Sequence, residues 1–218
     1  MSRMSSLEND NIRWLLRESA FNGVRAYNWK FEQADMNGEG IQTAKKYAES
    51  WDEMRQKNRG LLFCGPVGTG KSFAAGCIAN ELLERTFPVE VRMTNLPTVL
   101  NRITGCSGEA RIKYLDRLLK AELLILDDFG VERGTDFAKE QIFNLIDQRS
   151  RSMKPLIVTT NLSVSDLCSV KDMAAERIYS RILEMCVPVV FDGADRRKEI
   201  ARQNQKQFMQ ELRKGACE

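Results

Sequence analysis

Eight consecutive residues carry the clearest chemistry in this sequence, because they fit the pattern G-x-x-x-x-G-K-[ST] in full. They are Gly65, Pro66, Val67, Gly68, Thr69, Gly70, Lys71 and Ser72. Glycines let backbone N–H groups turn inward around phosphate oxygens, Lys71 would reach the outer phosphates, and the Ser72 hydroxyl would hold Mg²⁺. A glycine-rich turn that binds nothing is the alternative. However, an apolar, strand-like run precedes the loop and a helix-forming run follows it, and this context favours phosphate binding.

Two carboxylates form the second candidate group. Asp127 and Asp128 directly follow the apolar residues 123–126, which predict a buried strand. In an open parallel sheet, ligands bind at the carboxyl ends of the strands. We therefore expect Asp127 to orient the Mg²⁺ shell and Asp128 to polarise an attacking water. The alternative is an ordinary turn after a core strand, where Asp is common.

An amide and a pair of arginines complete the candidate set. Residues 156–161 predict another buried strand that ends in Asn161, which could hydrogen-bond the attacking water or a phosphate. Its alternative role is to cap the next turn. Residues 173–185 predict a helix, and its Arg177 and Arg181 are four residues apart, so they share one face.

The elements that must position these residues alternate along the chain. Further strands are predicted at residues 89–93 and 187–191, and helices at residues 41–57, 73–84, 96–103, 109–120, 137–153 and 195–214. This alternation predicts an α/β fold, a three-layer sandwich with a parallel sheet. Residues 1–24 also predict an amphipathic helix, which either docks a partner or covers the domain's own core.

Composition excludes several kinds of chemistry. The 218 residues include no histidine, which excludes a histidine general base and any histidine zinc site, and the net charge of +3 does not by itself argue for a nucleic-acid partner. The six cysteines are Cys64, Cys77, Cys106, Cys168, Cys186 and Cys217. None forms a C-x-x-C pair, so we expect free thiols in a reducing cytoplasm. No apolar run approaches ~20 residues, so no membrane span is expected.

Taken together, the motifs resemble the AAA+ ATPases of the DnaC/DnaI helicase-loader type and their IstB-type relatives from transposons. Residues 65–72 look like a Walker A motif, 123–128 like Walker B, 158–161 like the sensor 1 strand, and 176–182 like the segment that carries the arginine finger. The resemblance implies a P-loop NTPase sandwich with strand order 5-1-4-3-2 and binding of ATP and Mg²⁺. It also implies a homo-oligomer with ATP between subunits, contact with single-stranded DNA, and action on a hexameric replicative helicase.

The resemblance assigns roles to individual residues. The assigned residues are the loop 65–72 for ATP, Ser72 and Asp127 for Mg²⁺, and Asp128, Asn161 and Arg181 for catalysis. Asp128 stands where many members have Glu, and Glu132 is the next candidate base. Arg181 is the expected finger, although it and Arg177 could instead bond to acids on their own surface.

Three segments are expected. Residues 1–40 form an N-terminal helical extension or linker, 41–195 the ATPase domain, and 196–218 a basic C-terminal helix packed on the domain. About 25 residues follow the last strand, too few for the C-terminal helical lid of most AAA+ proteins, so Arg196 or Arg197 would have to replace the usual sensor 2 arginine. The first 40 residues hold no cysteine and are too short for the helicase-binding domain that loaders generally carry.

The leading hypothesis is a cytoplasmic DNA-replication protein with Mg²⁺-dependent ATPase activity. A transposition-assisting ATPase would share every nucleotide-site residue. A nucleotide-gated DNA-binding switch with little turnover would need neither Asp128 nor Arg181, and a small-molecule phosphotransferase would need an acceptor pocket. Basic clusters at residues 196–206 and 111–117 predict contact with single-stranded DNA, or else solvated faces.

Overall fold

A parallel sheet lies at the centre of the molecule. The computed structural model describes residues 6–21, 24–130 and 135–215, and within them five strands pair in the order β2-β3-β4-β1-β5. The strands are β1 (Gly60–Cys64), β2 (Val91–Asn95), β3 (Leu123–Asp127), β4 (Leu156–Thr159) and β5 (Cys186–Val190). The predicted order 5-1-4-3-2 is therefore confirmed, read from the opposite edge.

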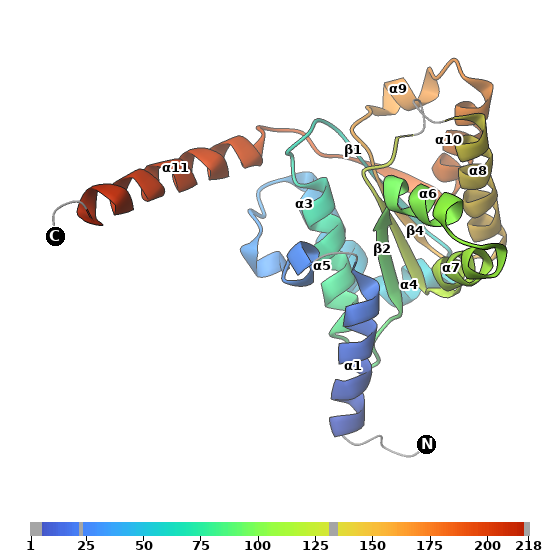
Figure 1. Ribbon diagram of the computed structural model, residues 1–218, viewed down its shortest axis with the longest axis horizontal. Coiled ribbons are helices and arrows are strands. Elements are labelled where there is room, and N and C mark those ends of the chain that lie inside the picture. Colours follow the sequence, from blue (N-terminus) through green and yellow to red (C-terminus); the bar gives the residue numbers. More distant parts are fainter. Residues whose placement is uncertain (1–5, 22–23, 131–134, 216–218) are drawn as a thin grey trace.

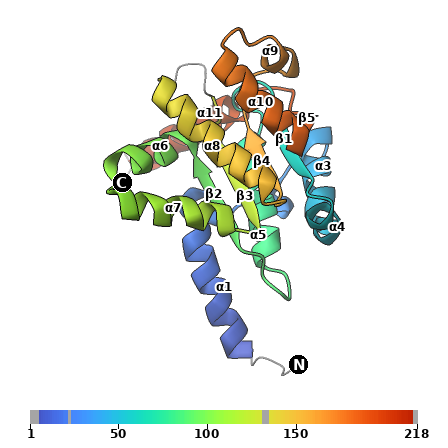
Figure 2. The same ribbon diagram turned by 90° about the vertical axis from the view of Figure 1, so that its right-hand side faces the viewer.

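Helices cover both faces of this sheet (Figure 1 and Figure 2). On one face lie α1 (Ser6–Ala20), α2 (Val24–Tyr27), η1 (Phe31–Gln33), α3 (Glu39–Glu49), α4 (Trp51–Gln56) and α5 (Lys71–Leu83). On the other lie α6 (Leu96–Gly105), α7 (Gly108–Lys120), α8 (Asp136–Arg151) and α10 (Met173–Met185). The short α9 (Val164–Cys168) follows β4, and α11 (Arg196–Gly215) follows β5. Within the described ranges, no helix is both long and apolar enough to cross a membrane.

The central strands are apolar on both faces because each face is covered by helices. Leu61 and Phe63 of β1 face the helices α3 and α5, whereas Leu62 and Cys64 face α8 and α10. The edge strand β5 differs, since it contains Pro188 and pairs with β1. Proline cannot donate a ladder hydrogen bond, which suits it to an edge.

A buried arginine joins the amino ends of β3 and β4. The Arg149 side chain from α8 is fully buried. Its two terminal nitrogens donate to the backbone oxygens of four residues: Leu119 (3.1 Å), Ala121 (2.7 Å), Glu122 (2.9 Å) and Pro155 (2.6 Å). Burial lowers the pKa of Arg149 to about 10. One side chain thus fixes the end of α7 and the starts of two strands.

The N-terminal segment covers part of the domain's own core. Phe21 forms a parallel bridge with Met93 of β2, and the Asn80 amide of α5 donates to the backbone oxygens of Ala26 (2.8 Å) and Trp29 (2.9 Å). The residues that follow α1 are therefore hydrogen-bonded both to the edge strand β2 and to helix α5.

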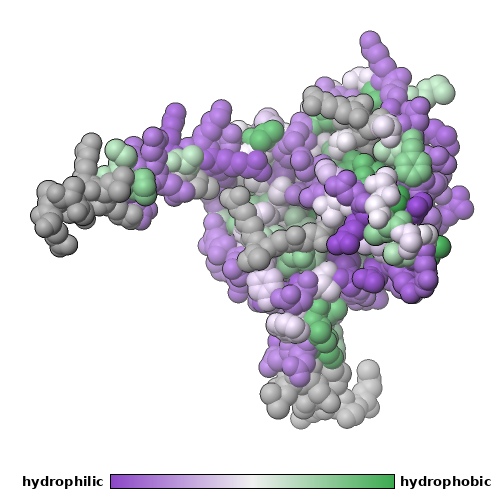
Figure 3. All heavy atoms as spheres, viewed as in Figure 1, coloured by the Kyte–Doolittle hydropathy of each residue, from purple (hydrophilic) through white to green (hydrophobic). Residues whose placement is uncertain are grey.

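Three features of the chain differ from the sequence prediction. The helix expected at 41–57 is divided into α3 and α4 at Ser50, whose ψ of 20° interrupts the regular backbone. The short elements α2, η1 and α9 were not predicted. The expectation that residues 196–218 pack on the domain is wrong for residues 201–210, whose side chains are all exposed, and α11 projects from the body (Figure 1 and Figure 3). These side chains are mostly polar, so they gain little from burial against the domain.

Candidate nucleotide-binding site

The phosphate loop joins β1 to α5 at the carboxyl edge of the sheet, as its strand–loop–helix context predicts. Gly65 and Gly68 both have positive φ, 134° and 82°. A Cβ atom at Gly65 would overlap the backbone oxygen of Phe191, and one at Gly68 would overlap the Asp195 carboxylate. Glycine is therefore required at Gly65 by backbone conformation and by space, and at Gly68 by backbone conformation, since the Asp195 side chain could move aside. The segment after β5 supports the loop from one side.

Lys71 begins α5 and turns back over this loop. Its Nζ donates to the backbone oxygens of Gly65 (2.7 Å) and Pro66 (2.6 Å), and the residue is only 6% exposed. Burial lowers the pKa of the Lys71 ammonium, while the nearby carboxylates of Asp128 and Asp127 raise it. Lys71 is thus a partly desolvated cation at the loop, with anionic groups opposite.

The two carboxylates lie at the end of β3, as predicted, and β4 holds them. Thr159 Oγ1 donates to Asp127 Oδ1 (2.7 Å) and accepts from the Asp128 backbone N–H (2.9 Å). Asp128 has a φ of 50°, a conformation that Asp adopts more readily than most residues. Asp127 is half-buried, whereas Asp128 is exposed at the edge.

Asn161 lies beside Asp128. Its Nδ2 donates to Asp128 Oδ1 (3.0 Å). Because β4 is parallel to β3 and adjacent to it, the residues after the two strands meet at one edge, which is why motifs more than thirty residues apart form one group. The structure therefore brings together Lys71, Asp127, Asp128 and Asn161.

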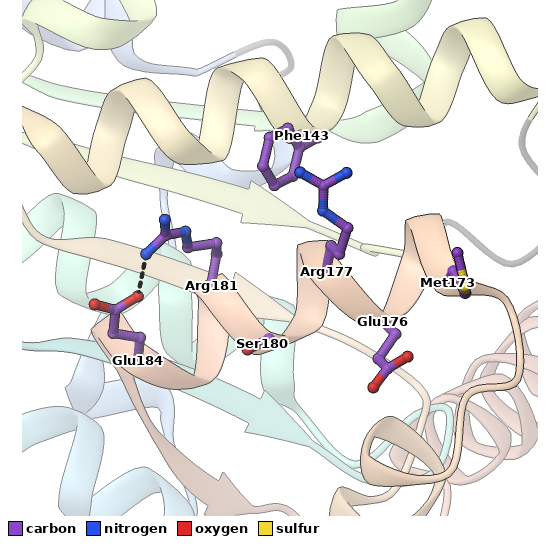
Figure 4. A pocket seen from close by; sticks show the side chains of 7 residues that line it. All are labelled: Phe143, Met173, Glu176, Arg177, Ser180, Arg181 and Glu184. Atoms are coloured by element: carbon purple, nitrogen blue, oxygen red, sulfur yellow. Dashed lines mark hydrogen bonds and ion pairs between the residues drawn. The ribbon is translucent and has the colours of Figure 1, made fainter.

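Arg181 is not part of this group in the structure. Its guanidinium pairs with Glu184 (2.7 Å) and with Asp147 of α8 (3.5 Å). Arg177, one turn earlier, stacks over the Phe143 ring at 4.6 Å. Both arginines line a shallow pocket of 390 Å³ between α8 and α10 (Figure 4). The alternative in which the arginines bond to acids on their own surface therefore describes Arg181 but not Arg177, which stacks on a ring. A role of Arg181 toward a neighbouring subunit stays a prediction.

The residues after β5 also reach the phosphate loop. The Arg196 backbone N–H donates to the Gly68 oxygen (3.0 Å), and its side chain pairs with Asp35 (3.3 Å). Arg197 is near enough to Lys71 to lower the pKa of that ammonium further. Of the two arginines expected to replace sensor 2, Arg197 therefore has the direct electrostatic link to the site.

Sequence reasoning missed two supporting residues. Thr159 was assigned only to a strand, although a hydroxyl near the end of a strand beside the carboxylates could have signalled its bond to them. Asp195 accepts a hydrogen bond from the Arg197 backbone N–H (3.0 Å), which its position directly before a helix could have signalled, but no local pattern indicates that it lies against Gly68. Glu132, the alternative base, lies outside the described residues.

The residues present fit a magnesium nucleotide. Mg²⁺ takes oxygen ligands, usually one or two from the protein with phosphate oxygens and water completing the shell. Ser72 and Asp127 supply a hydroxyl and a carboxylate of this kind. Among the described residues, no group of three or more His, Cys, Asp or Glu side chains could hold a metal ion by itself. Phosphate oxygens and water would therefore have to complete the shell of Mg²⁺.

Comparison with known proteins identifies a family of ATP-binding proteins. Residues 11–204 match the family of IstB-like ATP-binding proteins. The replicative helicase loader DnaC of Escherichia coli (strain K12) is 28% identical over 189 residues, which are 83% of this chain and 74% of DnaC. The replicative helicase loader DnaI of Bacillus subtilis (strain 168) is 25% identical over 182 residues, 77% of this chain and 58% of DnaI. A crystal structure of the DnaC helicase loader aligns with a TM-score of 0.68 at 24% identity and covers 78% of this chain and 100% of that one.

Proposed function

The chain belongs to the family of IstB-like ATP-binding proteins, and we propose that it is a DNA-replication ATPase that acts on a replicative helicase in the cytoplasm. It would hydrolyse ATP with Mg²⁺ between subunits of a homo-oligomer and contact single-stranded DNA. The proposed ATPase activity rests on one observation: Lys71, Asp127 and Asp128 lie close together at one edge of the sheet. The similarity to two replicative helicase loaders supports the partner.

Each residue of the group has a separate task in this proposal. Ser72 and Asp127 would hold Mg²⁺, which neutralises charge on the phosphates when bound. Lys71 would exchange its bonds to the loop oxygens for bonds to phosphate oxygens. Asp128 would orient and polarise the attacking water, and the Asn161 amide fixes the rotamer of that carboxylate through their 3.0 Å bond.

The test of hydrolysis is the Asp128→Asn variant. Asparagine keeps the shape of Asp128 but cannot act as an anionic base, so turnover should fall roughly 10²–10⁴-fold. Affinity for a fluorescent ATP analogue should stay close to that of the parent. Steady-state phosphate release is measured with and without single-stranded DNA, and Asp116→Asn, an exposed residue of α7, is the control. A parent protein without any phosphate release would favour a nucleotide-gated switch over an ATPase.

The test of the shared site mixes two inactive variants, Lys71→Ala and Arg181→Ala. If Arg181 acts on the neighbour's ATP, some mixed interfaces pair an intact phosphate loop with an intact arginine. Such a finger is worth on the order of 10³–10⁵ in rate, so activity should return on mixing and should rise with protein concentration. If both variants still assemble and mixing restores nothing, Arg181 does not act in trans.

The family description leaves a transposition-assisting ATPase as the second candidate. The nucleotide-site residues would be the same in both proteins, so variants of the site cannot separate them. A pull-down of the full chain against a purified replicative helicase and a purified transposase can. Retention of the transposase alone would replace the helicase in the proposal.

A further inference from the structure

Lys139 is a buried cation that takes no part in the nucleotide site. In the described part of the chain, three basic side chains are buried: Lys71 at the phosphate loop, Arg149 at the amino ends of the strands, and Lys139 near the start of α8. Lys139 is 7% exposed, and its Nζ lies 2.7 Å from Asp172 Oδ2. Asp172 caps α10, since its other oxygen accepts from the Ala175 backbone N–H (2.8 Å). One carboxylate therefore fixes the start of α10 and joins it to α8.

Stability alone does not explain a lysine at this position. A cation in the first turn of a helix opposes the positive end of the helix dipole, and burial removes its hydration. Because that desolvation is costly, a buried ion pair is often no more stabilising than apolar side chains of similar volume. Lys139 therefore departs from the local rules, and such departures are expected where function determines the residue.

Lys139 belongs to a stripe of three side chains along one face of α8. Lys139, Phe143 and Asp147 are spaced four residues apart, so they share that face, and each holds one residue of α10. The three contacts, in order along both helices, are Lys139–Asp172 (2.7 Å), Phe143–Arg177 (4.6 Å from the guanidinium to the ring centre) and Asp147–Arg181 (3.5 Å). A shift of α10 along α8 would break all three contacts together. The α8 stripe therefore fixes the place of both arginines, which Figure 4 shows one turn apart on α10.

The α8 stripe restrains these arginines but leaves them accessible. Arg177 is exposed, and stacking on a ring uses the flat face of its guanidinium, so the N–H groups in the plane stay available to an anion. The Arg181 side chain is 42% exposed between Asp147 and Glu184. Like charges one helical turn apart repel each other, and the Phe143 ring carries no net charge to offset that of Arg177. An anion beside the two guanidiniums is therefore favoured.

We propose that Lys139, Phe143 and Asp147 are positioning residues, which hold Arg177 and Arg181 at one fixed place for a phosphate group outside their own subunit. The inference rests on the proposed function, in which that phosphate belongs to ATP bound by a neighbouring copy of the chain. Phe143 and Asp147 orient one guanidinium each, and Lys139 fixes α10 along α8.

The first experiment uses the mixture of Lys71→Ala and Arg181→Ala, in which only the Lys71→Ala subunit supplies an intact arginine. Lys139→Met is added to that subunit alone, so its own nucleotide site cannot influence the result. The kcat of phosphate release should fall roughly 10–100-fold, because small misplacements of a catalytic group cost rates of this order. The KM for ATP should not change, since the phosphate loop of the other subunit binds ATP.

Two further variants separate positioning from general damage to the fold. Lys139→Arg keeps a cation that reaches Asp172 and should recover most of the turnover. Lys120→Met removes an exposed lysine that pairs with Asp116 of α7 (2.7 Å) and should have no effect. Undiminished kcat with Lys139→Met would overturn the role of Lys139 and leave the proposed function intact. If the mixture without Lys139→Met has no activity, action in trans fails, and the reason to position the arginines fails with it.

The ring is tested in the same mixture. Phe143→Leu keeps an apolar side chain but removes the ring, and the kcat should fall about threefold, as expected for an exposed cation–π contact. Phe143→Tyr keeps the ring and should match the parent. Equal turnover with leucine and tyrosine would show that the ring does not orient Arg177.

A spectroscopic measurement reads the position of Arg177 without ATP. In the full chain with isotope-labelled arginine, the Arg177 Nε–H proton should resonate upfield of exposed arginines, because it lies near the face of the Phe143 ring. Its signal is identified by its absence in Arg177→Lys. Lys139→Met should move it downfield, whereas Lys120→Met should leave it in place. An Arg177 signal that Lys139→Met does not move would show that Lys139 does not position α10, and would overturn the proposal.

Discussion

Each end of the sheet contains a buried cation, but the two cations are held differently. At the amino end, Arg149 donates to backbone oxygens from the end of α7 and from the residues before β3 and β4. At the carboxyl end, Lys71 donates to two backbone oxygens of its own loop. Burial lowers the pKa of both side chains. Only Lys71 has carboxylates nearby, those of Asp127 and Asp128.

This difference separates a structural cation from a functional one. The planar guanidinium of Arg149 is held in one geometry by carbonyls of separate segments, and moving it would break several bonds at once. The ammonium of Lys71 is a compact charge on a flexible stem, so it can exchange loop oxygens for phosphate oxygens at small cost. We therefore expect substitutions at the amino end to change stability and those at the carboxyl end to change binding and turnover.

The largest expected effect on stability is that of Arg149→Met. Methionine has a suitable volume but no donors, so the Ala121 oxygen loses its bond from Arg149 and the Pro155 oxygen keeps only the long 3.5 Å bond from the Leu124 backbone N–H. An unsatisfied buried polar group costs about 1–3 kcal/mol, and we expect a loss of roughly 3–5 kcal/mol in the free energy of unfolding. Urea unfolding followed by circular dichroism measures it. Arg149→Lys keeps a positive charge and hydrogen-bond donors at this position, so its free energy of unfolding should lie between those of the methionine variant and the parent. If the methionine variant is as stable as the parent, Arg149 does not join the strands as described.

Lys71→Ala should give the opposite result. The charge-assisted bonds that an ammonium makes to phosphate are strong, so affinity for a fluorescent ATP analogue should fall by about a hundredfold or more. The free energy of unfolding should change by less than about 1 kcal/mol, because lost hydrogen bonds are offset by relief of a desolvated charge. If Lys71→Ala strongly lowers the free energy of unfolding, or keeps the parental affinity for the ATP analogue, Lys71 and Arg149 do not differ in the way described.

The sequence predicted the carboxyl end far better than the amino end. The strands predicted at 123–126 and 156–161 could be recognised from the continuous apolar runs 123–126 and 156–158. The parallel order then requires the polar residues that follow these runs to meet. Arg149 could not be recognised, since an arginine within a helical pattern is usually exposed. Its burial depends on three segments that meet only in the folded chain. The contact of Arg196 with Gly68 likewise joins residues far apart in the sequence, and no spacing rule connects them.

The α11 prediction failed for a different reason. Ile200, Phe208 and Leu212 suggested an apolar face for packing, but polar side chains separate them along the helix. A helix packs on a domain only where the domain offers a complementary apolar surface. The amphipathic pattern of the helix alone does not predict whether such a surface exists.

Substitution of Thr159 is expected to have the smallest effects on stability and turnover. This residue is connected to both the amino and the carboxyl end of the sheet. It lies in β4, the strand whose amino end is fixed by Arg149, and its buried hydroxyl holds Asp127 and the backbone of Asp128. Thr159→Val keeps the shape and removes both bonds. We expect a loss of about 1–2 kcal/mol in stability and a fall in phosphate release of roughly tenfold, because Asp127 and Asp128 lose their common support.

The control for this variant is Thr159→Ser, which keeps the hydroxyl and loses only a methyl group. It should retain most of the turnover. Affinity for the ATP analogue measured without Mg²⁺ should be similar in both variants, since Thr159 acts on the carboxylates and not on the phosphate loop. If Thr159→Val lowers stability but leaves turnover unchanged, the hydroxyl has only a structural role. Thr159 would then belong with Arg149 among the structural residues, and the functional residues at the carboxyl end of the sheet would begin with Asp127 and Asp128.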